Sequence, residues 1–323
     1  MVPFEAEKFE PFMESTVQPW LAAHVQSGQF PGYDGRMLQF YHAEHPDAKG
    51  VIVMLHGFCG FFGKYHEVVY DFWEKGYTIY FLEHRGHGQS YRPVSNPDMV
   101  DVSDFEEYVE DLKCFVDGII RPEQTADLFL YAHSMGGCIA TMFLERYPDV
   151  FRAAILTSPM LNINFGSTPY WKVKLTAVGT RILGWNDRYV PGQGDFDGKD
   201  GFEESGASCR ERYEYSFRMR TDPEYQRAYT TNGASCRWAR ASLRAIKSLR
   251  EKEAGLNMPI LILQAGHDTF VDNKAENHLR KTAKHALLVR FPEAKHEIFN
   301  SEGKTLEKYY QTIFRFLDRY TQS

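Results

Sequence analysis

The chain has 323 residues, a length typical of one large domain or two smaller ones. Its formal charge of −6 argues against a strongly basic nucleic-acid-binding protein. A content of 43% hydrophobic and 25% charged residues is typical of a globular chain rather than a disordered one. No apolar run approaches the roughly 18 residues that a membrane-spanning helix needs.

The N-terminal sequence is acidic and lacks the basic end and apolar run of a secretory signal. Five cysteines without a C-x-x-C pair are typical of free thiols rather than of a disulfide framework or a zinc site. We therefore expect a protein of the reducing cytoplasm.

In chain order, short apolar runs predict strands and amphipathic stretches predict helices. Strands are predicted at residues 37–41, 51–55 and 78–83, and a helix follows Ser103, which has the spacing of a capping box with Glu106. A strand at 128–132, a helix at 136–147 and a strand at 153–157 come next. Strands at 260–264 and 287–291 and a helix at 305–320 complete the series. This alternation predicts an α/β fold with a mostly parallel central sheet flanked by helices.

The alternation stops at about residue 161 and resumes near residue 258. A structureless loop of that length is implausible inside a compact domain, so we expect an inserted, mainly helical cap. The predicted organisation is a first part of the core at residues 1–160, a cap at 161–245 and a second part of the core at 246–323.

The segment LFLYAHSMGG, residues 128–137, passes directly from a predicted strand into a predicted helix. A nucleophilic serine at such a strand–turn–helix junction needs small residues two positions before and after it. Ala132 and Gly136 satisfy this requirement around Ser134. The competing interpretation, an ordinary strand–helix loop, does not require small residues at both positions.

A serine hydroxyl becomes a nucleophile when a base removes its proton and a carboxylate orients that base. Sites in parallel sheets gather where the strands end, which favours His296, after the last predicted strand, and Asp268, after the strand at 260–264. His285 precedes its strand and His278 falls in a helical stretch. Asp272 is the rival carboxylate and is expected to tie down the loop.

The loop after the strand at 51–55 reads HGFCG. Gly57 allows the backbone to turn so that the amide of Phe58 points at a developing oxyanion, and the amide of Met135 is the second expected donor. A plain turn at His56 and Gly57 is the alternative interpretation. The segment at 84–90 is interpreted as a structural turn that packs beneath the site.

The motifs HGFCG (56–60), EHRGHGQS (83–90), AHSMGG (132–137), LQAGHD (263–268) and AKHEIF (294–299) resemble the α/β-hydrolase superfamily. Within it, the chain is similar to the bacterial lysophospholipase and monoacylglycerol-lipase group, and the similarity covers nearly the whole chain after about residue 15, including the cap. The resemblance implies Ser134 as nucleophile, His296 as base and Asp268 as acid. It also implies the Phe58 and Met135 amides as the oxyanion hole.

The predicted cap carries an uneven charge, with ten Lys and Arg against four acidic residues between positions 205 and 250. Because guanidinium groups pair bidentately with phosphate, Arg237 and Arg240 are candidate ligands of an anionic headgroup. A solvated helix face is the alternative. Trp238 and Tyr215 are candidates for lining an acyl channel, although core packing accounts for most aromatic residues equally well.

These observations predict a serine carboxylester hydrolase for monoacyl lipids, either a lysophospholipid or a monoacylglycerol, that needs no metal or cofactor. The alternatives are an esterase or aminopeptidase for small soluble substrates, an acyltransferase with the same triad, and a non-enzymatic protein on a hydrolase scaffold. Peripheral contact with the inner face of the membrane is expected through the cap. No nucleic-acid partner is expected.

Overall fold

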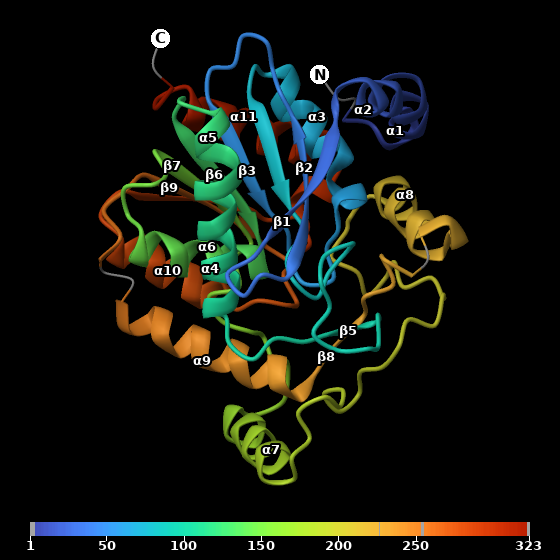
Figure 1. Cartoon of the computed structure of the whole chain (residues 1–323), viewed down its shortest axis with the longest axis vertical. Coiled ribbons are helices and arrows are strands. Elements are labelled where there is room, and N and C mark those ends of the chain that lie inside the picture. The colour runs from blue at the N-terminus through green and yellow to red at the C-terminus, as the bar shows by residue number, and fades with distance from the viewer. Residues whose placement is uncertain (1–3, 226, 253–254, 322–323) are drawn as a thin grey trace.

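A sheet of eight strands forms the centre of the computed structural model, which describes residues 4–225, 227–252 and 255–321 (Figure 1). Within this sheet, every strand except β1 confirms a predicted position to within one or two residues. Neighbours from β4 to β10 run parallel, whereas β1 and β2 pair antiparallel with each other and β2 pairs antiparallel with β4. In spatial order the strands are β1 (Gln26–Pro31), β2 (Met37–Ala43), β4 (Thr78–Leu82), β3 (Val51–Leu55), β6 (Leu128–His133), β7 (Ala153–Thr157), β9 (Ile260–Ala265) and β10 (Ala286–Phe291).

Strand β1 was not predicted. Its sequence QSGQFP has one buried residue, Phe30, and it contains Gly28 and Pro31, which are rare inside strands. An exposed edge strand of this kind leaves almost no apolar pattern in the sequence.

Helices cover both faces of the sheet, as predicted. In β3, Val51 and Leu55 belong to the core on one face, and Ile52 and Met54 to the core on the other. The first core is closed by α4 (Glu106–Phe115), α6 (Met135–Arg146) and α10 (Asn273–Thr282). The second is closed by α1 (Ala6–Phe12), α2 (Gln18–His24), α3 (His66–Glu74) and α11 (Gly303–Leu317). Short helical turns lie at η1 (Met13–Val17), η2 (Phe62–Tyr65), η3 (Val116–Ile120), α5 (Arg121–Glu123) and η6 (Ile298–Asn300).

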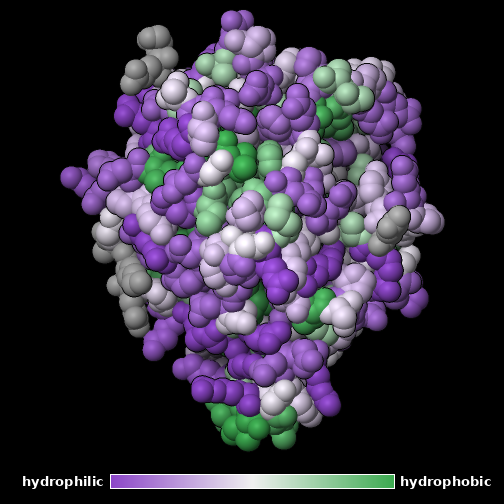
Figure 2. Space-filling model, viewed as in Figure 1, coloured by the Kyte–Doolittle hydropathy of each residue, from purple (hydrophilic) through white to green (hydrophobic). Residues whose placement is uncertain are grey.

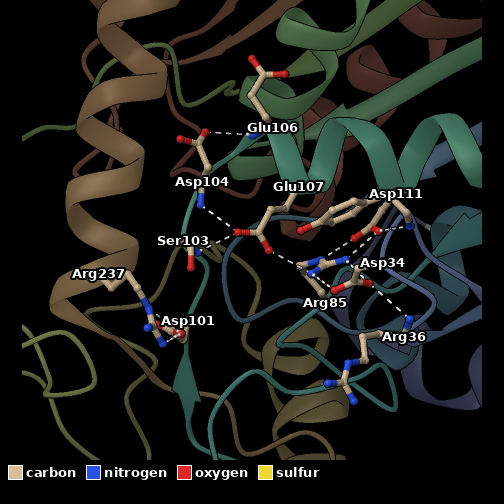
Figure 3. Close-up of polar contacts among 11 residues, drawn as sticks. Asp34, Arg36, Arg85, Asp101, Ser103, Asp104, Glu106, Glu107, Asp111 and Arg237 are labelled. Atoms are coloured by element: carbon tan, nitrogen blue, oxygen red, sulfur yellow. Dashed lines mark hydrogen bonds and ion pairs between the residues drawn. The ribbon is translucent and has the colours of Figure 1, made fainter.

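The start of α4 differs from the predicted capping box by one residue (Figure 3). The carboxylate of Glu107 accepts hydrogen bonds from the amides of Ser103 and Asp104, both at 3.1 Å, and the Asp104 carboxylate accepts from the Glu106 amide at 3.1 Å. The Ser103–Glu106 assignment was therefore wrong. Asp104 and Glu107 have the same three-residue spacing, and the sequence pattern did not distinguish the two pairs.

Between β7 and β9 the chain leaves the sheet and forms α7 (Tyr170–Ile182), α8 (Arg210–Thr221), η4 (Pro223–Tyr225) and α9 (Cys236–Lys252) (Figure 1). A short strand, β8 (Gly233–Ala234), pairs with β5 (Met99–Val100). Residues 183–209 contain no helix, although Tyr189 forms an isolated bridge with Ser235. Helix α9 packs on both α6 and α7 and continues past residue 245, so the division into core and cap stays a prediction.

Among the described helices, none combines the length and the apolar character that crossing a bilayer requires. Residues 1–3, 253–254 and 322–323, which fall within the two predicted core parts, lie outside the described residues.

Candidate active site

Ser134 occupies a sharp turn between the end of β6 and the start of α6. Its φ of 52° and ψ of −115° are rare for a residue other than glycine and cost conformational energy. Backbone hydrogen bonds hold this geometry, since the Ser134 amide donates to the Thr157 carbonyl at 3.1 Å and its carbonyl accepts from the Met160 amide at 2.9 Å. The turn lifts the side chain of Ser134 above the carboxyl edge of the sheet.

Small residues are required around this turn, as the sequence predicted. A Cβ on Gly136 would lie 2.6 Å from the carbonyl oxygen of Leu55 and 2.7 Å from that of His56. Ala132 is fully buried between Leu55 of β3 and Leu156 of β7, its partners in the sheet register. Close packing of α6 against the end of β3 therefore sets the position of Ser134.

The structure brings Ser134, His296 and Asp268 into one chain of hydrogen bonds. His296 Nε2 lies 2.8 Å from Ser134 Oγ, and His296 Nδ1 lies 2.6 Å from Asp268 Oδ2. Because the Asp268 carboxylate accepts a hydrogen bond from Nδ1–H of His296, the neutral ring has its lone pair on Nε2. Nε2 can therefore accept the hydroxyl proton of Ser134. All three side chains are buried, with His296 6% and Ser134 7% exposed.

Asp268 is oriented by its own loop. Its Oδ1 accepts hydrogen bonds from the amides of Phe270 at 2.8 Å and Val271 at 3.0 Å, while Oδ2 faces His296. The rival carboxylate, Asp272, lies elsewhere: it caps α10 by accepting from the Lys274 amide at 3.0 Å. It also accepts from the side chain of Asn162 at 3.1 Å, and it thereby ties the loop to the chain after β7.

The other histidines considered from the sequence do not reach Ser134. His285 is exposed, and its carbonyl accepts from the amide of Ile260, the first residue of β9, so it lies at the edge where the strands begin. His278 is exposed on α10.

The loop after β3 lies directly against Ser134. A Cβ on Gly57 would lie 3.1 Å from the Ser134 Cβ, and the amide of Gly60 closes a tight turn by donating to the Gly57 carbonyl at 2.9 Å. Within the part of the chain that the structure describes, neither the Phe58 amide nor the Met135 amide donates a hydrogen bond to another protein group. Both donors are thus available beside Ser134.

His56 controls the orientation of this loop, a role that the sequence analysis did not assign. Its Nε2 accepts from the His84 amide at 3.0 Å, so Nδ1 carries the proton and donates to the Gly57 carbonyl at 2.7 Å. Burial lowers the pKa of His56 to about 4, which keeps the ring neutral. Because a trans peptide directs its N–H opposite to its C=O, fixing the Gly57 carbonyl also fixes the direction of the Phe58 N–H.

A cavity of about 960 Å³ opens above Ser134 and His296. Trp238 lines it and packs against Phe58, with ring centroids 4.7 Å apart, and Arg240 lines it near α7. The other two candidate substrate-binding residues lie elsewhere. Arg237 is ion-paired with the buried Asp101 (Figure 3). Tyr215 packs on Phe9 of α1, and its hydroxyl forms a hydrogen bond with the ring of His66.

Possible metal ligands approach one another at the other side of the molecule. His42, Glu44 and Glu123 bring three such atoms within 4.8 Å of one another near the edge where the parallel strands begin. This group is remote from Ser134, and Tyr80 already donates a hydrogen bond to Glu123 at 2.9 Å.

Comparison with known proteins places the chain in a family. Residues 46–303 match the family described as serine aminopeptidase, S33. The chain is 30% identical over 269 residues to lysophospholipase L2 of Escherichia coli (strain K12), which covers 80% of this chain and 76% of that protein. It is 28% identical over 263 residues to the monoacylglycerol lipase of Mycolicibacterium smegmatis, covering 80% of this chain and 85% of that protein.

A similar fold is found in a soluble variant of monoglyceride lipase from Saccharomyces cerevisiae, solved in complex with a substrate analog. The TM-score is 0.72 at 19% identity, covering 93% of this chain and 95% of that one. Because the family match spans most of the chain and the sheet has the same architecture, the protein belongs to the family described as serine aminopeptidase, S33, and is a hydrolase of the α/β-hydrolase fold.

Proposed function

We propose that this protein is a serine carboxylester hydrolase that acts on monoacyl lipids through Ser134, His296 and Asp268. The observation that carries the proposal is the continuous hydrogen-bonded path from Asp268 Oδ2 through the His296 ring to Ser134 Oγ, with distances of 2.6 and 2.8 Å. Such a path lets a neutral imidazole take the hydroxyl proton while the carboxylate stabilises the resulting cation.

In the proposed reaction, His296 Nε2 removes the proton of Ser134 as Oγ attacks the ester carbonyl. The oxyanion is held by the Phe58 and Met135 amides, and one such donor is typically worth about 3 kcal/mol of transition-state stabilisation. The alcohol leaves with the proton from His296. Water then attacks the acyl-enzyme, with His296 again serving first as base and then as acid, and the fatty acid is released.

A monoacyl substrate is supported by the cavity and by the relatives. A volume of about 960 Å³ is at the upper end of the range for small-molecule sites, roughly 300–1,000 Å³. Apolar side chains line much of it, among them Phe58, Met160, Val173, Leu243 and Phe270. The relatives named lysophospholipase and monoacylglycerol lipase point to esters that carry one acyl chain.

The family description also favours a second candidate, an aminopeptidase. That activity needs a carboxylate to hold the substrate's amine. Among the described residues that line the cavity, Glu297 is paired with Lys64, Asp197 is paired with Lys199 at 2.9 Å, and Glu204 is exposed. Two of these three acidic groups are already neutralised by lysines, which favours an ester over a peptide substrate.

Active-site labelling and a substrate panel test this function. A fluorophosphonate probe is expected to label the wild type and not Ser134→Ala. The wild type is expected to hydrolyse monopalmitoylglycerol or palmitoyl lysophospholipid much faster than an amino-acid p-nitroanilide. Folded wild-type protein that resists labelling would contradict the mechanism, and preference for the anilide would favour the aminopeptidase. Product analysis with added glycerol separates hydrolysis from acyl transfer.

We further propose that α7 contacts an anionic lipid surface. Its outward face carries Trp171, Leu175, Val178 and Ile182 at helical spacing, with Leu175 62% and Ile182 79% exposed. Figure 2 shows the resulting apolar patch at the end of the molecule where Figure 1 places α7. The opposite face, with Val173, Ala177 and Thr180, lines the cavity, so α7 separates the site from the proposed lipid surface.

The charge around this patch supports an anionic surface. Lys172, Lys174, Arg181 and Arg188 are exposed beside the apolar residues. Leu175→Ser with Ile182→Ser is expected to reduce co-sedimentation with phosphatidylglycerol vesicles about tenfold or more, because two exposed apolar side chains that would enter the lipid are lost. Leu287→Ser, an exposed residue of β10, is the matched control. Unchanged binding of the double variant would contradict the assignment.

A further inference from the structure

The cations that line the cavity differ in how their charge is balanced. Among the described lining residues, Lys64 pairs with Glu297 and Lys199 pairs with Asp197. Arg220 and Arg240 also line the cavity, and within the described part of the chain neither forms an ion pair with a carboxylate. Two guanidinium groups therefore face the cavity without a carboxylate in direct contact, although the charges of Asp98 and Glu297, which pair with Arg227 and Lys64, act on Arg220 from a greater distance.

Arg220 is held rigidly at the end of α8. Its Nε donates to the Tyr229 carbonyl at 3.2 Å, and its Nη2 donates to the Thr231 carbonyl at 3.0 Å and the Asn232 side chain at 3.3 Å. The guanidinium lies 4.0 Å from the ring centroid of Phe196. These contacts employ Nε and Nη2, and Nη1 donates to no described protein group. Two N–H donors thus remain on a side chain whose orientation is already fixed.

Other enclosed arginines in the fold have protein groups that balance their charge or accept hydrogen bonds from their Nη atoms. Arg85 pairs with Asp111 at 2.6 Å, and Arg212 pairs with Glu67 at 2.6 Å. No carboxylate of the described residues pairs with Arg92, but both of its Nη atoms donate to backbone carbonyls, two for each nitrogen. Arg220 has neither arrangement. An enclosed cation without a direct counter-charge costs free energy, and burial accordingly lowers the pKa of Arg220, whereas the more distant charges of Asp98 and Glu297 act in the opposite direction.

Arg220 is close to the loop that carries the proposed oxyanion donor. The preceding residue, Met219, packs against Gly63 in the segment that follows this loop. Burial raises the pKa of the Cys59 thiol to about 12, and the charge of Arg220 is the largest influence that opposes this shift. Cys59 directly follows Phe58 and lines the cavity with Arg220, so this guanidinium lies on the side of the cavity where the ester carbonyl is expected.

We propose that Arg220 binds the phosphate of a monoacyl glycerophospholipid, which makes an anionic lysophospholipid the preferred substrate over a monoacylglycerol. The inference rests on the proposed ester hydrolase function and names the substrate class within it. The phosphate of such a lipid is attached to the glycerol unit only a few bonds from the ester carbonyl. It supplies a counter-charge in direct contact, and Nη1 supplies charge-assisted hydrogen bonds.

Arg240 is the less suitable of the two groups. Its Nη1 donates to Thr180 at 3.0 Å and its Nη2 donates to Asn186, so both nitrogens connect α9 with the α7 region. Among the residues that the structure describes it has no carboxylate partner, but it is the more solvated guanidinium, and water reduces the cost of leaving its charge unpaired.

The test compares Arg220→Gln and Arg220→Lys with the wild type on three esters: palmitoyl lysophosphatidylglycerol, monopalmitoylglycerol and p-nitrophenyl butyrate. For Arg220→Gln we expect kcat/KM on the lysophospholipid to fall about 10- to 100-fold, the range for a hydrogen bond to a charged group. The two neutral esters are expected to change less than about twofold. Arg220→Lys is expected to recover part of the lysophospholipid activity because it keeps the charge. Arg218→Gln is the matched control, since Arg218 lies on the same helix, is exposed and pairs with Glu10.

Each other outcome overturns the assignment. An equal loss on all three esters would show that Arg220 only supports the local structure. An unchanged preference in Arg220→Gln, or a selective loss in Arg240→Gln instead, would show that Arg220 does not bind the headgroup.

A wild type that hydrolyses monopalmitoylglycerol but not lysophosphatidylglycerol would overturn this inference and leave the proposed ester hydrolase function intact. Inactivity of the wild type on all three esters would overturn the proposed function itself. Competitive inhibition of p-nitrophenyl butyrate hydrolysis by inorganic phosphate, without preference for the lysophospholipid, would identify a site for free phosphate instead.

Discussion

Arg85 and Asp111 form a buried bidentate ion pair that joins the turn after β4 to helix α4. Nε donates to Oδ2 at 2.6 Å and Nη2 donates to Oδ1 at 2.8 Å, and both side chains are 2% exposed (Figure 3). The same turn supplies the His84 amide that binds His56, so this ion pair supports the loop beside Ser134.

Removing one partner of this pair is expected to destabilise the fold strongly. Asp111→Ala leaves the guanidinium of Arg85 buried without its main counter-charge, although Asp34 and Glu107 also contact it. We expect a loss of about 3–5 kcal/mol in the free energy of unfolding, measured by urea denaturation. Asp117→Ala, which removes an exposed partner of Lys113, should cost less than about 1 kcal/mol. Equal losses in the two variants would contradict this view of Asp111.

The choice between the two candidate carboxylates is directly testable. Asp268→Asn is expected to lower kcat by about 10⁴-fold, because the amide no longer selects the histidine tautomer that accepts from serine. Asp272→Asn should retain most activity, since asparagine is also a good N-cap for α10. Kinetics on p-nitrophenyl butyrate distinguish the two, and a larger loss in Asp272→Asn would reverse the assignment.

Gly136 is expected to be intolerant of any side chain. The Cβ of Gly136→Ala would meet the backbone of β3 at 2.6 Å, so the turn at Ser134 must shift. Fluorophosphonate labelling is expected to fall by about 10²-fold or more, because displacing a reacting group by about 1 Å has that effect. The Cβ of Gly118→Ala would meet no described atom within 4 Å apart from its own helix backbone. Because Gly118 lies in a helical segment, this variant should label normally and unfold no more readily than the wild type.

A half-buried histidine outside the site is expected to make stability depend on pH. Burial lowers the pKa of His66 from 6.5 to about 3, so the unfolded chain binds a proton at His66 before the folded protein does. The contribution of neutral His66 is therefore complete above about pH 6.5 and is lost as the pH falls toward about 3.

His66→Gln measures this contribution. Its free energy of unfolding should fall less steeply than that of the wild type between pH 6.5 and pH 4. The exposed His285 provides the control, since His285→Gln should follow the wild-type curve. Parallel curves for the wild type and His66→Gln would show that His66 does not contribute.

The core and the candidate catalytic residues could be predicted because both depend on local patterns. Strands buried on both faces need continuous apolar runs, so their positions were found to within one or two residues, whereas the exposed β1 was missed. The rule that sites lie where parallel strands end selected His296 and Asp268 from many candidates, and the structure places both beside Ser134.

The candidate substrate-binding residues depended on contacts between distant parts of the chain. Arg237 and Arg220 look alike in the sequence, but Asp101, 136 residues away, neutralises Arg237, while no described carboxylate pairs with Arg220. Backbone periodicity and turn chemistry thus determined the sheet, the serine turn and the order of the proposed triad. Only the tertiary structure decided which charges remain unpaired in the cavity, because the pairing of charges depends on distances in space and leaves no periodic signal along the chain.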